Sequence, residues 1–151
     1  MKRIASFDID HEKLDRGLYL SRQDGDVVTY DLRLKRPYVQ MPLSTGSLHA
    51  IEHIGATFLR NSERADEIVY FGPMGCRTGF YLLVKQSIDE KSLKDLLRRT
   101  FAFISTFEDV IPGCSTKECG NCYDMNLPEA RKEAAAYLKV LEAKKDVPLT
   151  Y

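Results

Sequence analysis

The chain has no excess of charge of either sign, which limits the partners it can have. Its 151 residues include 22 Lys plus Arg and 22 Asp plus Glu, so the formal net charge is zero. A protein that neutralises many phosphates needs a surplus of basic residues, usually gathered on one face. We therefore do not expect nucleic acid to be a partner of this protein.

The sequence also lacks any long hydrophobic run. No segment approaches the roughly 20 apolar residues that cross a bilayer as a helix. The basic N-terminal residues are followed by Asp8 and Asp10 rather than by an apolar stretch. We expect no signal peptide and no membrane partner, and we expect the protein to be soluble and cytoplasmic.

No linker, repeat or low-complexity segment divides the chain. An apolar content of 44% and an aromatic content of 10% are ordinary for a globular protein. A length of 151 residues suits a single domain, residues 1–151, with a substantial core.

Cysteines are few and unevenly placed. Cys76 stands alone in a glycine-rich segment, whereas Cys114, Cys119 and Cys122 lie close together. In a reducing compartment, such residues are more often ligands, nucleophiles or buried thiols than disulfides. Cys119-x-x-Cys122 has no second CxxC to complete a zinc ribbon. It also lacks the strand-to-helix context of a redox pair, so these two interpretations stay weak.

Hydrophobic periodicity predicts an α+β domain. Two strands, 17–22 and 27–34, flank an Asp-Gly turn typical of a hairpin. Val28, Tyr30 and Leu32 should share one face of the second strand, with Asp31 and Arg33 on the other. Strands 67–71 and 80–85 flank the turn 72–79. Helices are expected after the capping candidates near Ser44, over 89–107, and from Asn126 to about Lys145. The natural packing is an antiparallel sheet with helices packed on it.

The predicted helix after Ser44 carries the sequence His49-Ala-Ile-Glu52-His53. Residues four apart lie on one helix face, so both imidazoles can coordinate one divalent cation. Glu52 lies beside them, within reach of a metal-bound water or a substrate proton. The pattern HxxEH also occurs in zinc peptidases of the inverzincin type, which are one alternative. A non-catalytic metal-binding module is another.

Two histidines need at least one more ligand, and the segment 117–122 supplies thiols. A set of two histidines and one cysteine with an open position is a known catalytic arrangement. Sequence alone does not choose among iron, zinc and cobalt.

Cys76 lies in the segment Pro73-Met-Gly-Cys-Arg-Thr-Gly79. The neighbouring glycines allow close approach of a ligand, and the adjacent Arg77 would favour a thiolate. The alternative is a small buried residue in a hairpin turn.

Three segments together resemble one known family. The motifs His49-Ala-Ile-Glu-His53, Gly72-Pro-Met-Gly-Cys-Arg-Thr-Gly-Phe-Tyr81 and Lys117-Glu-Cys-Gly120 occur in the order and spacing of S-ribosylhomocysteine lyase, the LuxS family. Segments 6–11 and 30–33 also fit, so the resemblance covers nearly the whole chain.

The resemblance implies an activity and a set of site residues. Such enzymes cleave S-ribosylhomocysteine to homocysteine and 4,5-dihydroxy-2,3-pentanedione, the precursor of autoinducer-2, by successive enolisations and β-elimination. By likeness, Cys76 and Glu52 are the general acid/base pair. The metal ligands are His49, His53 and Cys119, holding one Fe(II) per subunit, with Zn(II) as a possible substitute.

The resemblance also implies a homodimer with two active sites at the subunit interface. Ser6, His11 and Arg33 match residues that reach substrate there, from the neighbouring subunit. One departure is Tyr70, which stands where many relatives have an acidic residue. Another is Cys122, a second thiol close to the expected ligand Cys119.

Overall fold

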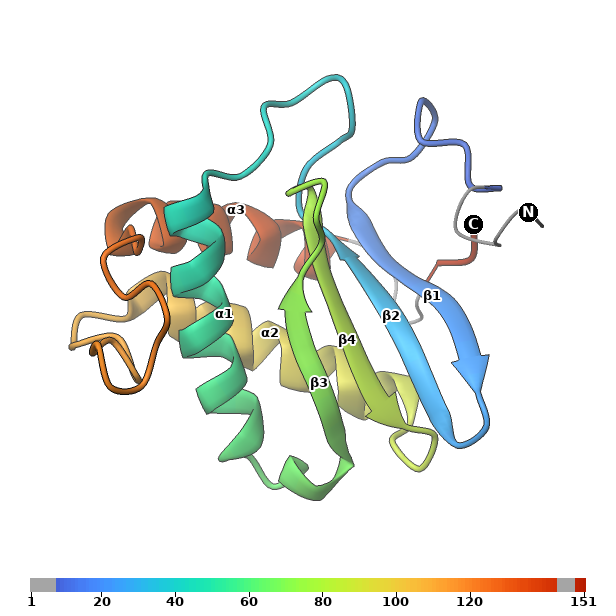
Figure 1. Ribbon diagram of the computed structural model, residues 1–151. Helices are drawn as coiled ribbons and strands as arrows, with labels where there is room; N and C mark the ends of the chain where they lie inside the picture. The colour runs from blue at the N-terminus through green and yellow to red at the C-terminus, as the bar shows by residue number, and fades with distance from the viewer. Residues whose placement is uncertain (1–7, 144–148) are drawn as a thin grey trace, which may run out of the picture.

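The computed structural model describes residues 8–143 and 149–151 of the chain. Its centre is a four-stranded antiparallel sheet with the strand order β1-β2-β4-β3. The strands are β1 (Gly17–Asp24), β2 (Val27–Arg33), β3 (Ile68–Pro73) and β4 (Gly79–Lys85). The helices are α1 (Thr45–Arg60), the short 3-10 helix η2 (Ala65–Glu67), α2 (Glu90–Thr106) and α3 (Leu127–Ala143). The α+β fold class is thus confirmed (Figure 1).

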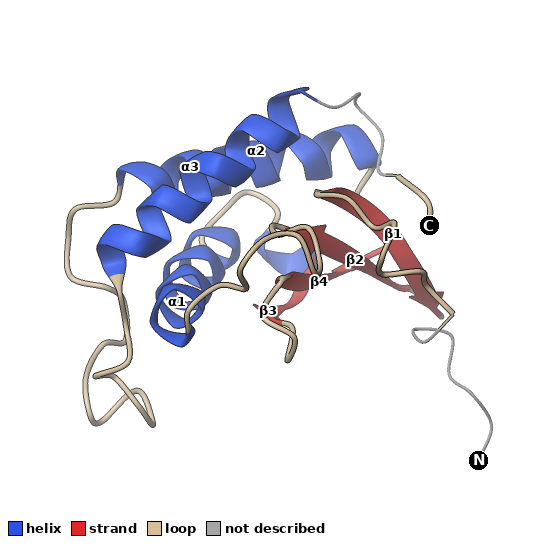
Figure 2. Ribbon diagram, turned by 90° about the horizontal axis from the view of Figure 1, so that it is seen from above, coloured by secondary structure: helices blue, strands red, loops and turns tan. Residues whose placement is uncertain are grey.

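The three α-helices lie on one side of the sheet, and the core fills the space between them (Figure 2). Val28, Tyr30 and Leu32 of β2 are buried on this side, as the alternation in the sequence predicts. The apolar stripes of the helices meet them. Fully buried helical residues include Ile51, Ile54, Leu93, Leu96, Leu97, Phe101, Ile104 and Ala134.

Polar side chains begin the helices where the sequence predicts. The Ser44 hydroxyl accepts a hydrogen bond from the backbone N–H of Ser47 at the start of α1, and Asp89 caps α2 in the same way. Asn126 accepts from the backbone N–H of Glu129 at the start of α3. Such caps satisfy backbone donors that the first helical turn leaves free. The expected end of α3 near Lys145 lies outside the described residues.

The opposite face of the sheet is also partly covered. Asp31 and Arg33 project to this side, as predicted, yet both side chains are buried and form an ion pair. Leu149 adds a short parallel bridge to the outer edge of β1, and Tyr151 stacks on Tyr19 with ring centroids 5.1 Å apart. In the part of the chain that the structure describes, no helix is long and apolar enough to span a membrane.

Candidate active site and metal centre

Helix α1 presents His49 and His53 on the same face, as their spacing predicts. The two ring centroids lie 4.7 Å apart, in an edge-on arrangement. The helix is held in this position because its other face is buried in the core through Leu48, Ile51 and Ile54. Both histidines are half-buried at the border of that core.

Cys119 comes from the irregular segment between α2 and α3 and completes a cluster with these histidines. One ligand atom from each of the three residues lies within 4.8 Å of the others. The Cys119 sulfur is 3.3 Å from Nε2 of His49. Two ligands on one tetrahedral zinc ion are about 3.5 Å apart. The separations therefore fit a set of two histidines and one cysteine around a divalent cation.

The histidine rings are oriented by backbone carbonyl groups. Nδ1 of His49 lies 3.0 Å from the carbonyl oxygen of Asp124, and Nδ1 of His53 lies 2.7 Å from that of Pro112. A carbonyl oxygen only accepts, so each Nδ1 carries the proton and each Nε2 is free to bind a cation.

Gly113 makes one of these contacts possible. It has a φ of +69°, and a Cβ at this position would lie 3.2 Å from Nδ1 of His53. A side chain there would be strained and would crowd the ring. Glycine therefore allows the backbone to approach close enough for the carbonyl of Pro112 to accept from His53.

The cluster favours Cys119 over Cys122 as the third member. Cys122 is absent from the cluster of potential ligands that the described residues form, and its carbonyl oxygen instead accepts from the Cys114 thiol. A zinc peptidase of the HxxEH type requires an acidic residue as its third metal ligand, whereas the third member of this cluster is a cysteine. That alternative is not favoured.

Cys76 lies in the exposed turn between β3 and β4, close to two polar groups. Its sulfur is 3.1 Å from the Thr78 hydroxyl and 3.8 Å from Nη1 of Arg33. The same Nη1 donates to the Thr78 hydroxyl oxygen at 2.6 Å. With that oxygen accepting from Arg33, the single Thr78 proton is available to the sulfur.

These contacts favour the thiolate form of Cys76. Burial raises the pKa of the thiol, but hydrogen bonds from Thr78 and the positive charge of Arg33 outweigh it and bring the pKa below its ordinary value. A larger fraction is then deprotonated near neutral pH, which suits a group that takes up protons. The guanidinium beside the sulfur belongs to Arg33 of β2, whereas the sequence suggested Arg77.

Two residues of this site are absent from the sequence-based prediction. Thr78 bonds both Arg33 and Cys76, and Asp31 holds the other end of the Arg33 guanidinium. Arg33 lies 45 residues before Thr78, and only the antiparallel pairing of β2 with β4 brings them together. The one available signal was the shared strand face of Asp31 and Arg33.

A cavity of about 400 Å³ lies beside the thiol. Cys76, Thr78 and His11 line it, together with the segment 37–42. None of the three residues of the metal cluster is among its described lining residues. Figures 1 and 2 show why: the segment 107–126, which carries Cys119, and the β3–β4 turn lie on opposite sides of α1.

The remaining expected site residues have simpler surroundings. Glu52 is half-buried on α1, directly before His53. His11 is held by the carbonyl of Ile9, 2.9 Å from its Nδ1. Ser6 lies outside the described residues.

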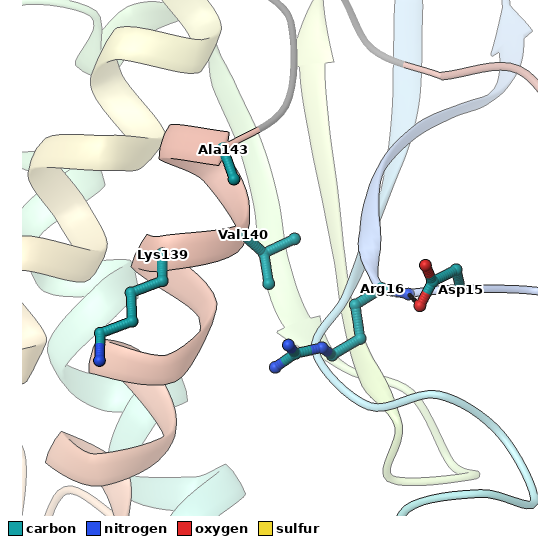
Figure 3. A pocket seen from close by; sticks show the side chains of 5 residues that line it. All are labelled: Asp15, Arg16, Lys139, Val140 and Ala143. Carbon is teal, nitrogen blue, oxygen red and sulfur yellow. Dashed lines mark hydrogen bonds between the residues drawn. The ribbon is translucent and has the colours of Figure 1, made fainter.

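A second cavity lies between the start of β1 and the last turns of α3 (Figure 3). The guanidinium of Arg16 and the side chain of Val140 face each other across it, and Lys139 points away. It measures about 230 Å³, and no histidine or cysteine of the described chain lines it. Of these two cavities, the one beside Cys76 is therefore the candidate for the active site.

Comparison with known proteins shows the family of the chain. Residues 4–147 match the family model described as S-Ribosylhomocysteinase (LuxS). An S-ribosylhomocysteine lyase of Borreliella afzelii is 48% identical over 156 aligned residues, which cover 100% of this chain and 99% of the relative. One of Clostridium beijerinckii is 50% identical over 143 residues, covering 91% and 90%. One of Desulfotalea psychrophila is 48% identical over 157 residues, covering 100% and 99%.

The family model spans nearly the whole chain, and the relatives align with the chain from end to end at about 48% sequence identity. The motifs that carried the resemblance are the ones that the fold turns into a His-His-Cys cluster and an activated thiol. The chain therefore belongs to the S-ribosylhomocysteinase (LuxS) family.

Proposed function

We propose that this protein cleaves the carbon–sulfur bond of S-ribosylhomocysteine, giving homocysteine and 4,5-dihydroxy-2,3-pentanedione. The observation that carries the proposal is the presence, in one chain of this family, of a His-His-Cys cluster and a separate thiol with a lowered pKa. A peptidase would need only the metal-bound water and Glu52. The hydrogen bonds and the positive charge that lower the pKa of Cys76 would then have no catalytic role.

The reaction requires groups that move protons between neighbouring carbons and oxygens. The sugar carbonyl migrates along the chain by enolisation until the thioether sulfur lies β to it, and the sulfur then leaves as the thiol. Each step removes a proton from a carbon next to a carbonyl group. We assign this task to the Cys76 thiolate, held by Thr78 and Arg33, and assign proton transfer at the sugar oxygens to Glu52.

We further propose that His49, His53 and Cys119 hold one Fe(II) per subunit, with Zn(II) as a possible substitute. Two neutral imidazoles and one thiolate are suitable donors for either ion. A bound divalent ion would supply Lewis-acid polarisation of the sugar oxygens and offset the negative charge of the enediolate. The four free cysteines suit a reducing compartment, and we propose that the protein acts in the cytoplasm.

We also propose that the active site forms between two copies of the chain. Cys76 and His11 share a cavity that the metal cluster does not line. The rim of that cavity carries Tyr38 and Met41, which are 88% and 84% exposed. Large apolar side chains exposed beside a cavity are typical of interaction surfaces. In a homodimer, Cys76, His11 and Arg33 of one protomer would meet Glu52 and the metal cluster of its partner.

The direct test is release of free thiol from S-ribosylhomocysteine by protein purified without oxygen and loaded with Fe(II). We expect rapid release by the native chain and none by Cys76→Ala with its metal content unchanged. Absence of thiol release from native protein with confirmed metal occupancy would overturn the proposal. Loss of metal from Cys76→Ala would instead make Cys76 a ligand.

The two alternatives give different results in the same assay. A peptidase would cleave peptides and would continue to do so after Cys76→Ser. A non-catalytic metal module would be indifferent to Glu52→Gln, whereas we expect that variant to lose about a hundredfold or more in rate of thiol release.

A further inference from the structure

We propose that Tyr151 is a positioning residue for Cys76. Its hydroxyl group holds the carboxylate of Asp31, Asp31 holds the guanidinium of Arg33, and Arg33 contacts the sulfur of Cys76. The inference rests on the proposed function in one respect, which is that Cys76 is the thiol that carries protons.

The backbone places Tyr151 at this point. The N–H of Leu149 donates to the carbonyl of Leu18 at 2.8 Å, and the N–H of Leu20 donates to the carbonyl of Leu149 at 2.8 Å. Residues 149–151 are thereby aligned along the edge of β1. The ring of Tyr151 then stacks on that of Tyr19, with 4° between the ring planes.

From there the Tyr151 side chain reaches a buried ion pair. Its hydroxyl donates to Oδ2 of Asp31 at 2.5 Å, and the same oxygen accepts from Nη2 of Arg33. The side chains of Asp31 and Arg33 are only 1% and 2% exposed. Among the described residues, Oδ1 of Asp31 has no hydrogen-bond partner. The Tyr151 hydroxyl is therefore one of two groups that stabilise this buried carboxylate.

The position of Arg33 depends on how far Tyr151 shares in compensating the negative charge of Asp31. Its Nη1 donates to Thr78 and approaches Cys76, while its Nη2 is bound to Asp31. If the Tyr151 hydroxyl is removed, the negative charge of Asp31 is compensated by Arg33 alone. The guanidinium is then drawn toward Asp31, and the field at the sulfur becomes less positive. Both effects disfavour the thiolate form of Cys76.

The other titratable groups that the structure describes beside this chain of contacts are Tyr19, Tyr81 and Tyr137. Burial and the charge of Asp31 raise the pKa of each phenol. The pKa of Tyr151 is raised for the same reasons. All four phenols stay neutral through the range in which a thiol titrates, so they do not contribute to the measured midpoint.

The test is the pH dependence of Cys76 alkylation by iodoacetamide in Tyr151→Phe, followed for the Cys76 peptide by mass spectrometry. Phenylalanine keeps the stacked ring and removes only the hydroxyl. We expect the midpoint to move to higher pH by half a unit or more, which leaves about threefold less thiolate below the midpoint. The kcat of thiol release should fall in parallel, with KM unchanged.

Tyr19→Phe is the matched control. It removes a hydroxyl from the same stacked pair, one that donates to the Asp15 carbonyl instead of to Asp31, and should leave the alkylation midpoint unchanged. An unchanged midpoint in Tyr151→Phe, or an equal shift in both variants, would overturn the inference. Because alkylation needs no substrate, a native chain without lyase activity would refute the proposed function alone.

Discussion

At the scale of single residues, Cys119 and Cys122 have the same side chain and different surroundings. The Cys119 sulfur faces His49 and accepts from the backbone N–H of Asn121 at 3.4 Å, whereas Cys122 is absent from the cluster. We predict that Cys119→Ser lowers bound metal at least tenfold, since serine is a much poorer ligand than a thiolate. Metal analysis after dialysis measures this. Cys122→Ser is the control and should keep full occupancy; equal losses would show that the two thiols share the site.

Thr78 is the residue whose hydroxyl links Arg33 to the sulfur of Cys76. Thr78→Val keeps the shape of the side chain and removes the hydrogen bond that lowers the thiol pKa. The pKa of Cys76 should therefore rise, and the increase of reaction rate with pH should move to higher pH. At pH 7 we predict a loss of about three- to tenfold in rate, because a rise of one unit in the pKa lowers the thiolate fraction about tenfold. A pH–rate profile with its midpoint unmoved would contradict this role for Thr78.

At the scale of elements, the close pairing of β2 with β4 holds the residues around Cys76 together. Gly79 pairs with Arg33, and a Cβ on Gly79 would lie 2.2 Å from the backbone oxygen of Leu32. Gly79→Ala must push the two strands apart, and we predict a loss of about 1–3 kcal/mol in the free energy of unfolding. Urea denaturation measures it.

Gly75→Ala in the same turn is the control for that prediction. A Cβ on Gly75 would meet nothing within 4 Å, so its free energy of unfolding should stay close to that of the native chain. Similar losses in both variants would mean that the turn, and not the contact between strands, is sensitive to added volume.

Most elements could be predicted from the sequence because their signals are local. The Asp-Gly turn, the alternation in β2 and the caps at Ser44 and Asn126 each act within a few residues. The pair His49 and His53 was likewise visible from helical spacing alone. The turn predicted around Cys76 does separate β3 from β4, although β3 extends two residues further than expected, to Pro73. Of its glycines, Gly72 and Gly79 make close contacts.

The parts of the site that were missed depend on contacts between distant segments. Arg33 beside Thr78 follows from the register of β2 on β4, which alternation within each strand does not specify. Arg77 was favoured in place of Arg33 because it is adjacent in sequence. Asp31 was placed on the correct face, but its hydrogen bond with Tyr151 joins residues more than a hundred positions apart.

At the scale of the whole molecule, the separation of Cys76 from the metal cluster leads to a test of assembly. We predict that Cys76→Ala and Glu52→Gln, each inactive alone, regain activity when mixed under conditions that exchange subunits. A hybrid dimer would join the intact Cys76 of one protomer to the intact Glu52 of its partner. Random exchange should restore about a quarter of native activity, measured as thiol release. If each chain held a complete site, the mixture would stay inactive.

The two acceptors that orient the histidines are both main-chain carbonyls, those of Pro112 and Asp124. In many metal centres this role falls to a carboxylate, which adds negative charge and can be lost by a single substitution. Here the path of the backbone between α2 and α3 fixes the tautomer of each ring, because its carbonyl groups accept from Nδ1. With one divalent ion bound, the ion and a single thiolate would leave the centre with a net positive charge, which would favour an anionic sugar intermediate. An exchange of side chain at position 124 would leave that preference intact.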